Sequence, residues 1–131
     1  MHRKVAAYQV SNLAGTSPVE AEILAFGLCI DRLSRARDGK TRIEALAKNH
    51  QLWSTLVRDL SSGANGLPLP LRHTLLQLGL WSMAYSNRAI VEDVSLQPLI
   101  EVNRNTSEGL RAQVSGEATR STSDLPVIRS A

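Results

Sequence analysis

Residues 17–33 read SPVEAEILAFGLCIDRL and combine a helix start with a helical apolar pattern. Ser17 suits the N-cap, Pro18 the first helical position and Glu20 a capping box. The apolar residues that follow alternate in spacing between four and three positions, as on one face of an α-helix: Val19, Ile23, Phe26, Ile30 and Leu33. The opposite face carries charged residues: Glu22, Asp31, Arg32 and Arg35. The stretch predicts an amphipathic helix that Asp38 and Gly39 bring to an end.

A second stripe with the same spacing predicts a second helix, which ends at Ser61: Ile43, Leu46, His50, Trp53, Val57 and Leu60. Two glycines and two prolines within residues 63–70 then predict a turn, because they exclude both a helix and a central strand. A third helix is expected from about Pro70. It carries apolar residues on nearly all sides as far as Tyr85, so it is either central in the bundle or exposes an apolar face to a partner.

A fourth helix is predicted after Asp93 or Ser95, either of which can cap it, with Pro98 in the first turn. Its stripe continues the same spacing and ends near Gly109 to Arg111: Leu96, Leu99, Asn103, Thr106 and Leu110. The expected fold is all-α, a small antiparallel bundle of about four helices over residues 17–111. Residues 1–16 form an N-terminal segment in which a short helix is an open alternative. Residues 112–131 lack periodicity and are expected to be a disordered tail.

The composition excludes several classes of protein. The single cysteine, Cys29, cannot form an internal disulfide, and no Cys/His cluster offers the ligands of a structural zinc site. The longest apolar run, residues 23–30, is far shorter than the roughly 20 residues that span a bilayer. The first residues lack the apolar region of a secretory signal. We therefore expect a cytoplasmic protein without membrane insertion.

Catalytic motifs are absent from the sequence. The histidines, His2, His50 and His73, form no zinc-binding pattern, and neither a nucleophile elbow nor a glycine-rich phosphate loop occurs. His50 is interpreted as a partly buried packing residue and Cys29 as a small apolar core residue. We expect a protein that is not an enzyme and that needs no metal or cofactor.

The net charge of +3 raises the alternative of nucleic-acid binding. The candidate residues cluster after the first predicted helix: Arg32, Arg35, Arg37, Lys40 and Arg42. Asp31 and Asp38 interrupt this cluster, and no aromatic residue is interleaved on which a base could stack. The solvated end of a helix is therefore the favoured interpretation, and nucleic acid is an unlikely partner.

Several short motifs occur in an order that is typical of one family. They are Ala7-Tyr8, Ser17-Pro18 with Glu20, Ala25-Phe26, Asn49, Leu52-Trp53, Leu56, Asp59-Leu60, Asn65, Leu67-Pro68, Leu71-Arg72, Leu75, Leu78, Trp81, Leu99-Ile100-Glu101-Val102-Asn103 and Gly109-Leu110. Over residues 7–111 the chain thereby resembles the alphaproteobacterial FlaF family of flagellar biosynthesis regulators. The resemblance implies a cytoplasmic protein, without enzymatic activity, that is required for flagellin production and export. It further implies action beside FlbT and association with flagellin in the manner of a secretion chaperone.

A flagellin-binding surface would come from apolar residues of the second and third predicted helices: Trp53, Leu56, Leu60, Leu76, Leu80, Trp81 and Met83. Arg72, Glu101 and Asn103 are candidates for orienting the partner. For any single apolar residue the sequence favours the core over the interface, and Asn103 is equally suited to setting register inside the bundle. Two alternatives stay open: a regulator that binds RNA through the cationic cluster, and an adaptor that binds FlbT without binding flagellin.

Overall fold

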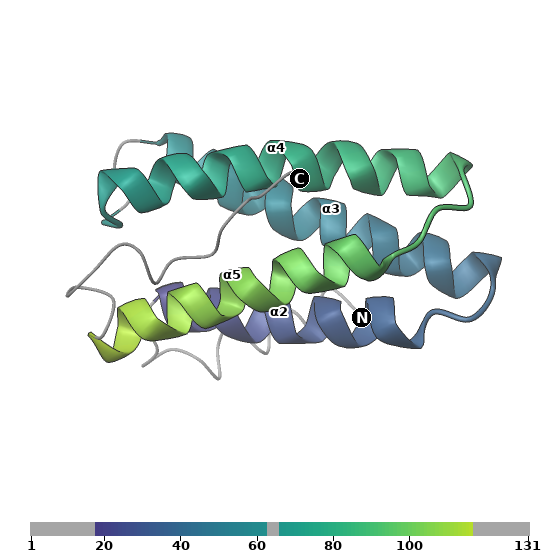
Figure 1. Ribbon diagram of the computed structural model, residues 1–131, viewed down its shortest axis with the longest axis horizontal. Coiled ribbons are helices and arrows are strands. Elements are labelled where there is room, and N and C mark those ends of the chain that lie inside the picture. Colours follow the sequence, from purple (N-terminus) through teal and green to yellow (C-terminus); the bar gives the residue numbers. More distant parts are fainter. Residues whose placement is uncertain (1–17, 63–65, 117–131) are drawn as a thin grey trace, which may run out of the picture.

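The computed structural model describes residues 18–62 and 66–116, and these residues form four α-helices and no strand. The helices are α2 (Pro18–Arg35), α3 (Gly39–Ser61), α4 (Leu69–Val91) and α5 (Gln97–Ser115). Consecutive helices run in opposite directions, with α4 packed mainly on α3 and α5 mainly on α2 (Figure 1). The predicted all-α antiparallel bundle is confirmed. The predictions for residues 1–16, for Ser17 as an N-cap and for residues 117–131 lie outside the described residues.

The α2–α3 connection uses Asp38 differently from the prediction. α2 already ends at Arg35, and Asp38 is the N-cap of α3. Its Oδ1 accepts a hydrogen bond from the Thr41 N–H at 2.8 Å, while the Asp38 N–H donates to Thr41 Oγ1 at 3.1 Å. This reciprocal capping box satisfies backbone groups that a helix start leaves without partners. Asp38 therefore starts the second helix rather than only stopping the first.

Both later helices are longer than the sequence predicted. α4 runs six residues past Tyr85, to Val91. Leu96 occupies the N-cap position of α5, and the Ser95 hydroxyl oxygen accepts the Gln97 N–H at 3.0 Å. α5 ends at Ser115, where Gly116 takes the left-handed conformation (φ 85°) that glycine adopts without strain. Residues 112–115 thus belong to the helix and not to a tail.

Two groups of buried residues form the core. One contains Phe26 and Trp53, whose rings meet edge to face with centroids 5.2 Å apart, and the other lies around Leu46 and Leu99. The predicted stripes of α2 and α5 point into this core, but the stripe of α3 is partly wrong because Ile43 is 48% exposed. The buried face of α3 is instead rotated slightly, to Ala45, Leu46, Asn49, Trp53, Leu56 and Leu60.

Close packing of α4 on α3 depends on Gly79. A Cβ at this position would collide with Cγ2 of Val57 and lie 3.1 Å from Cε3 of Trp53. The valine side chain is stiff in a helix, so it cannot easily give way. We expect Gly79→Ala to lower the free energy of unfolding by about 1–2 kcal/mol, since overpacking outweighs the better helix propensity of alanine.

The matched control for Gly79→Ala is Gly27→Ala, because a Cβ at the exposed Gly27 meets nothing within 4 Å. Urea unfolding should show Gly27→Ala to be stabilised by up to about 1 kcal/mol. Equal stabilisation of both variants would mean that α3 and α4 are not held at this close approach.

Candidate functional site

The structure divides the residues that were predicted to contact a partner. Trp53, Leu56, Leu60 and Asn103 are at most 1% exposed, so in this fold they are core residues and not a contact surface. Their prediction as interface residues is corrected, because α3 turns Trp53, Leu56 and Leu60 toward the other helices, and α5 buries Asn103. The remaining candidates lie at or near the surface: Arg72, Leu76, Leu80, Trp81, Met83 and Glu101.

A buried chain of hydrogen bonds gives Trp53 and Asn103 their actual role. Trp53 Nε1 donates to Asn103 Oδ1 at 2.9 Å, and Asn103 Nδ2 donates to Asn49 Oδ1 at 2.7 Å. Asn49 Nδ2 then donates to Ser86 Oγ at 2.9 Å. All four residues are fully buried, and together they join α3, α4 and α5. The network supports the alternative that Asn103 sets register, since buried polar groups require their partners at fixed positions.

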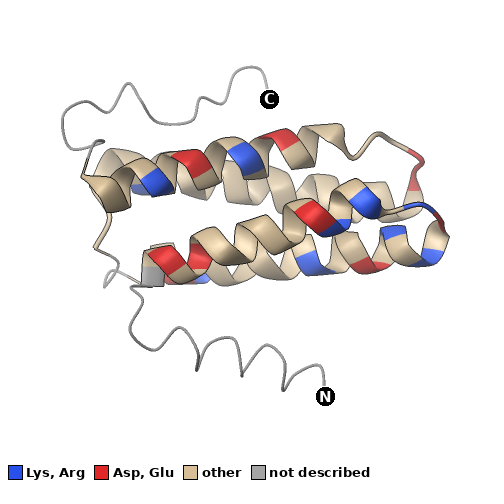
Figure 2. Ribbon diagram, turned by 90° about the horizontal axis from the view of Figure 1, so that it is seen from below, with Lys and Arg blue, Asp and Glu red and all other residues tan. Residues whose placement is uncertain are grey.

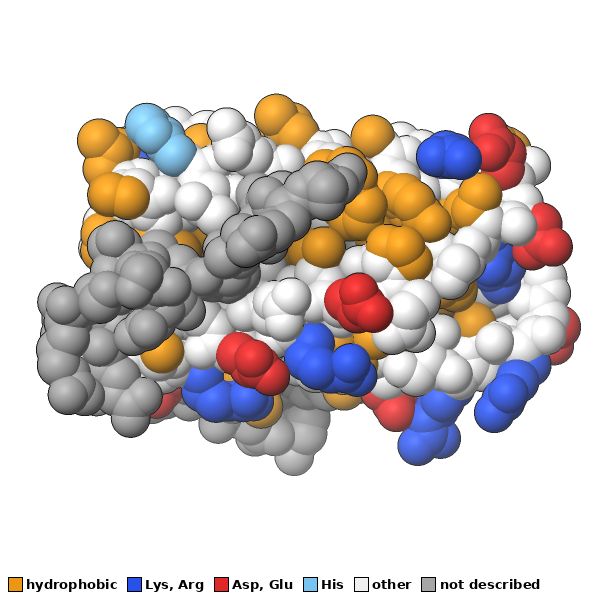
Figure 3. Space-filling model, in the orientation of Figure 1, with side chains coloured by type: hydrophobic (Ala, Val, Ile, Leu, Met, Phe, Trp, Pro, Cys, Tyr) orange, Lys and Arg blue, Asp and Glu red, His pale blue; other side chains and the backbone are white. Residues whose placement is uncertain are grey.

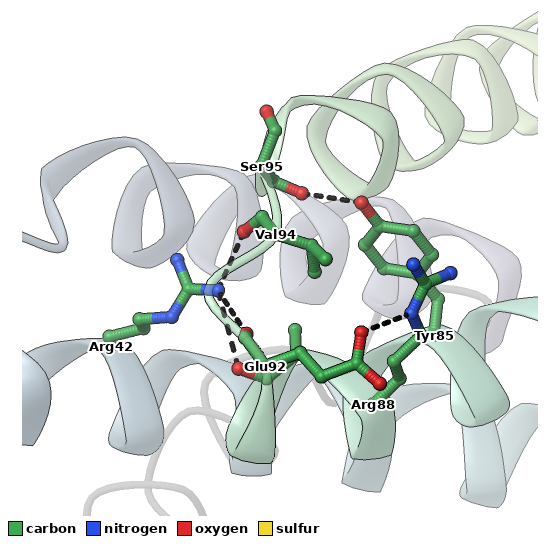
Figure 4. Close-up of polar contacts among 7 residues, drawn as sticks. Arg42, Tyr85, Arg88, Glu92, Val94 and Ser95 are labelled. Atoms are coloured by element: carbon green, nitrogen blue, oxygen red, sulfur yellow. Dashed lines mark hydrogen bonds and ion pairs between the residues drawn. The ribbon is translucent and has the colours of Figure 1, made fainter.

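Arg42, one of the cationic candidates, holds the α4–α5 connection. Its Nη2 donates to three carbonyl oxygens: Ala89 in the last turn of α4 (3.2 Å), Glu92 at its C-cap (3.2 Å) and Val94 in the connection (2.6 Å). Figure 4 shows Arg42 beside Glu92 and Val94. The last carbonyl oxygens of a helix lack donors within it, so a guanidinium is well placed to satisfy them. The Glu92 carbonyl oxygen also accepts the Val94 N–H at 2.9 Å. Arg42 is therefore engaged within the fold, and its prediction as a nucleic-acid contact is corrected.

The other cationic candidates share their surface with carboxylates. Arg35 forms an ion pair with Asp31 at 2.7 Å. An open depression of about 530 Å³ between α2 and α3 has a lining of both signs: Asp31, Arg32, Arg35, Ala36, Thr41, Glu44, Ala45 and Lys48. Charges of both signs also alternate along α5 (Figure 2). Arg37 and Lys40 are exposed on either side of Asp38, the N-cap of α3. The α2–α3 depression and α5 thus offer no continuous basic stripe of the kind that follows a phosphate backbone.

The surface of α4 is different, because the helix has no Asp, Glu, Lys or Arg between Arg72 and Arg88. Its apolar residues fall on two flanks. Leu76 and Met83 are half-buried on the α3 side, whereas Trp81 is half-buried on the side that packs with the α4–α5 connection. Leu80 lies between these two flanks, on the outermost line of α4, and is 62% exposed. The single surface predicted for these residues is therefore two surfaces.

We call Trp81, Tyr85, Val94 and Leu96 the Trp81 patch. Apolar side chains gather on this face over α4 and the α4–α5 connection (Figure 3). The rings of Trp81 and Tyr85 lie 5.1 Å apart, and the Tyr85 hydroxyl donates to the carbonyl oxygen of Ser95 at 2.7 Å. Arg88 lies 5.9 Å from the centre of the Tyr85 ring and pairs with Glu92 at 2.9 Å (Figure 4). The patch is an aromatic surface with a charged rim.

Arg72 is half-buried, and its side chain makes a hydrogen bond within the fold. Its Nη2 donates to the carbonyl oxygen of Leu60, at the end of α3, at 3.1 Å. This bond ties the guanidinium to the end of α3, and the role of Arg72 in orienting a partner stays a prediction. Glu101 is exposed on α5 and accepts a hydrogen bond from Gln97 at 3.4 Å.

Glu22 was expected on the solvent face of α2 but is half-buried there. Burial, and secondarily the negative charge of Asp59 on α3, raises the pKa of Glu22 from 4.5 to about 7. An acid whose folded-state pKa is raised stabilises the fold fully below its unfolded-state pKa, and this contribution disappears as the pH rises through the folded value.

We expect stability to fall between pH 4.5 and 7 by about 1–2 kcal/mol after solvent screening, and Glu22→Gln to abolish this part of the pH dependence. Urea unfolding at pH 5 and pH 8 measures the effect, with the exposed Glu44→Gln as control. Identical pH profiles for the wild type and Glu22→Gln would contradict the assignment.

The one cysteine of the sequence lies in the core. Cys29 is buried, its Sγ donates to the Lys48 carbonyl oxygen at 3.7 Å, and burial raises its pKa to about 11. The thiol therefore stays protonated, as an apolar core residue would. Within residues 18–62 and 66–116, His, Cys, Asp and Glu form no group that could hold a metal ion. The same residues include no helix that is both long enough and apolar enough to cross a bilayer.

Comparison with known proteins gives one match. A family model described as flagellar protein FlaF matches residues 4–110, which is most of the chain and includes nearly all of the described bundle. No curated protein and no solved structure matches the chain.

Proposed function

The chain belongs to the flagellar protein FlaF family, and from this premise we propose that it binds flagellin through the Trp81 patch. In this proposal it is a cytoplasmic regulator of flagellin synthesis and secretion that acts as a chaperone, by binding and without catalysis. The ligand would be an amphipathic helix of monomeric flagellin, whose apolar face needs cover until the monomers assemble.

The observation that carries the proposal is the aromatic pair on an uncharged stretch of helix. Trp81 and Tyr85 are half-buried at the surface, and residues 73–87 contribute no charged side chain beside them. Large aromatic residues dominate the energetics of protein interfaces because they bury much apolar area at a low cost in side-chain entropy. An apolar helix face could therefore dock on Trp81, with the Arg88–Glu92 ion pair beside Tyr85 at the rim of the contact.

The patch is also held in place before any partner arrives. Tyr85 is fixed by its bond to Ser95, and Arg42 fixes the α4–α5 connection that carries Val94. A surface that is ordered in the free protein loses little conformational entropy on binding. This rigidity favours a specific contact over a nonspecific apolar one.

The test is a calorimetric titration of the full chain with monomeric flagellin at two salt concentrations and several temperatures. We expect saturable binding that changes little with salt and has a negative heat-capacity change, because apolar surface is buried. Steep salt dependence would favour the electrostatic, RNA-type alternative. Absence of binding by the folded protein would overturn the proposal and make FlbT the partner to test next.

A further inference from the structure

The most exposed large apolar residues of the described chain form a line along α4. They are Leu69, Leu80 and Val91, which are 57%, 62% and 80% exposed. They follow one another at intervals of 11 residues, which in an α-helix is about three turns with a drift of only 20°. The line is roughly 33 Å long and parallel to the helix axis. We call this exposed line of Leu69, Leu80 and Val91 the crest of α4.

A second row of apolar residues runs beside this line, on the α3 side. Leu69, Leu76, Met83 and Ile90 are seven residues apart, and so are His73, Leu80 and Asn87. The face that packs α4 into the bundle is a different one, made of Leu71, Leu75, Leu78, Gly79, Ser82, Ser86 and Ala89. Leu76 and Met83 pack against the core from the edge of this face. Leu69, Leu80 and Val91 leave most of their side-chain surface exposed.

The crest of α4 is complementary to itself. Leu80 is the midpoint between Leu69 and Val91, so an antiparallel second α4 crossing at Leu80 brings Leu69 opposite Val91 of the second copy. The same crossing brings His73 opposite Asn87 of the second copy. A neutral imidazole and an amide can exchange hydrogen bonds in that position. Each of these two pairs occurs twice, once on either side of Leu80, as twofold symmetry requires.

Charge does not oppose this contact. The nearest charged residues on α4 are Arg72 and Arg88, and both are turned away from the crest. Arg72 bonds the Leu60 carbonyl oxygen beside α3, and Arg88 pairs with Glu92 beside Tyr85. Ile43 of α3, 48% exposed, extends the apolar area on the α3 side. Two copies can thus approach without bringing like charges together.

We infer that two copies of this chain associate through the crest of α4, with their α4 helices antiparallel and the twofold axis at Leu80. The Trp81 patch lies about 100° around the helix from Leu80 and stays open in this arrangement. A dimer would therefore carry two Trp81 patches. The inference rests on the crest alone and does not depend on flagellin binding.

Sedimentation velocity of the full chain over a range of concentrations tests the association. We expect a species of twice the 14.3 kDa chain mass. Leu80→Glu should raise the dimer dissociation constant by at least about 30-fold, as loss of a central contact does. Leu24→Glu, which changes a 51% exposed leucine on α2, should leave it unchanged. A wild-type monomer at about 100 μM, or equal effects of the two variants, would overturn the inference.

Cysteine cross-linking tests the orientation, against the low background of the buried Cys29. The twofold axis predicts that Leu80→Cys forms a disulfide-linked dimer on oxidation, whereas Val91→Cys alone does not. A mixture of Leu69→Cys and Val91→Cys should cross-link. Self-linking of Val91→Cys would show parallel helices and contradict the antiparallel arrangement, and failure of Leu80→Cys to link would contradict the crest contact itself.

Discussion

Asn103→Ala is expected to lower the free energy of unfolding by about 3 kcal/mol, the largest effect of any single polar substitution in the bundle. The change leaves the Trp53 indole N–H without its acceptor and Asn49 Oδ1 without its donor. Both groups are fully buried, so water cannot replace the lost bonds without opening the core. Urea unfolding followed by circular dichroism measures the change.

Asn105→Ala is the matched control, because Asn105 lies two residues away on the exposed face of α5. It should change stability by less than about 0.5 kcal/mol. A similar small effect of Asn103→Ala would mean that the network does not hold α3 and α5 together. A double-mutant cycle with Asn49→Ala should show strong coupling, since the two amides share one bond.

Trp81→Ala is expected to weaken flagellin binding by about 30-fold or more, on the premise of the proposed function. The indole provides the largest apolar contact area of the Trp81 patch, and its removal also takes away the ring that packs 5.1 Å from Tyr85. The variant should keep its helical spectrum, because Trp81 is half-buried and the core around Leu99 remains. Calorimetric titration with monomeric flagellin gives the ratio of affinities.

In the same calorimetric titration, Leu80→Ala distinguishes flagellin binding at the Trp81 patch from flagellin binding along the crest of α4. Leu80 is the neighbouring residue but points along the crest, so its truncation should change flagellin affinity by less than about threefold. The opposite result, with Leu80→Ala damaging and Trp81→Ala harmless, would place flagellin on the crest. That outcome would show that the Trp81 patch is not the binding site for flagellin.

The fold followed closely from the sequence because each helix carries a local signal. The stripe from Val19 to Leu33 and the proline-rich turn before α4 act over a few residues, and such signals survive without knowledge of the partners. Helix ends were less predictable. Asp38 was interpreted as the end of α2, whereas with Thr41 it forms the capping box that starts α3. Gly109 suggested the end of α5, but this helix continues to Ser115.

The division between core and surface could not be obtained from one helix at a time. Trp53 suggested an interface anchor, but its acceptor Asn103 is 50 residues away and enters only through the packing of α5. On α4 the expected preference is inverted: Ser82 and Ser86 are fully buried, while Leu80 and Val91 are exposed. A helix that is apolar on nearly all sides gives no sequence signal for which side faces inward.

The most direct test of the central claim uses the two tryptophans of the chain, Trp53 and Trp81, as separate reporters. The protein is labelled with 5-fluorotryptophan, its two fluorine resonances are assigned with Trp81→Phe, and unlabelled monomeric flagellin is added. We predict that the Trp81 resonance shifts or broadens in proportion to the bound fraction, while the resonance of the fully buried Trp53 does not move. An unchanged Trp81 resonance under conditions in which flagellin is bound would contradict the Trp81 patch as its site.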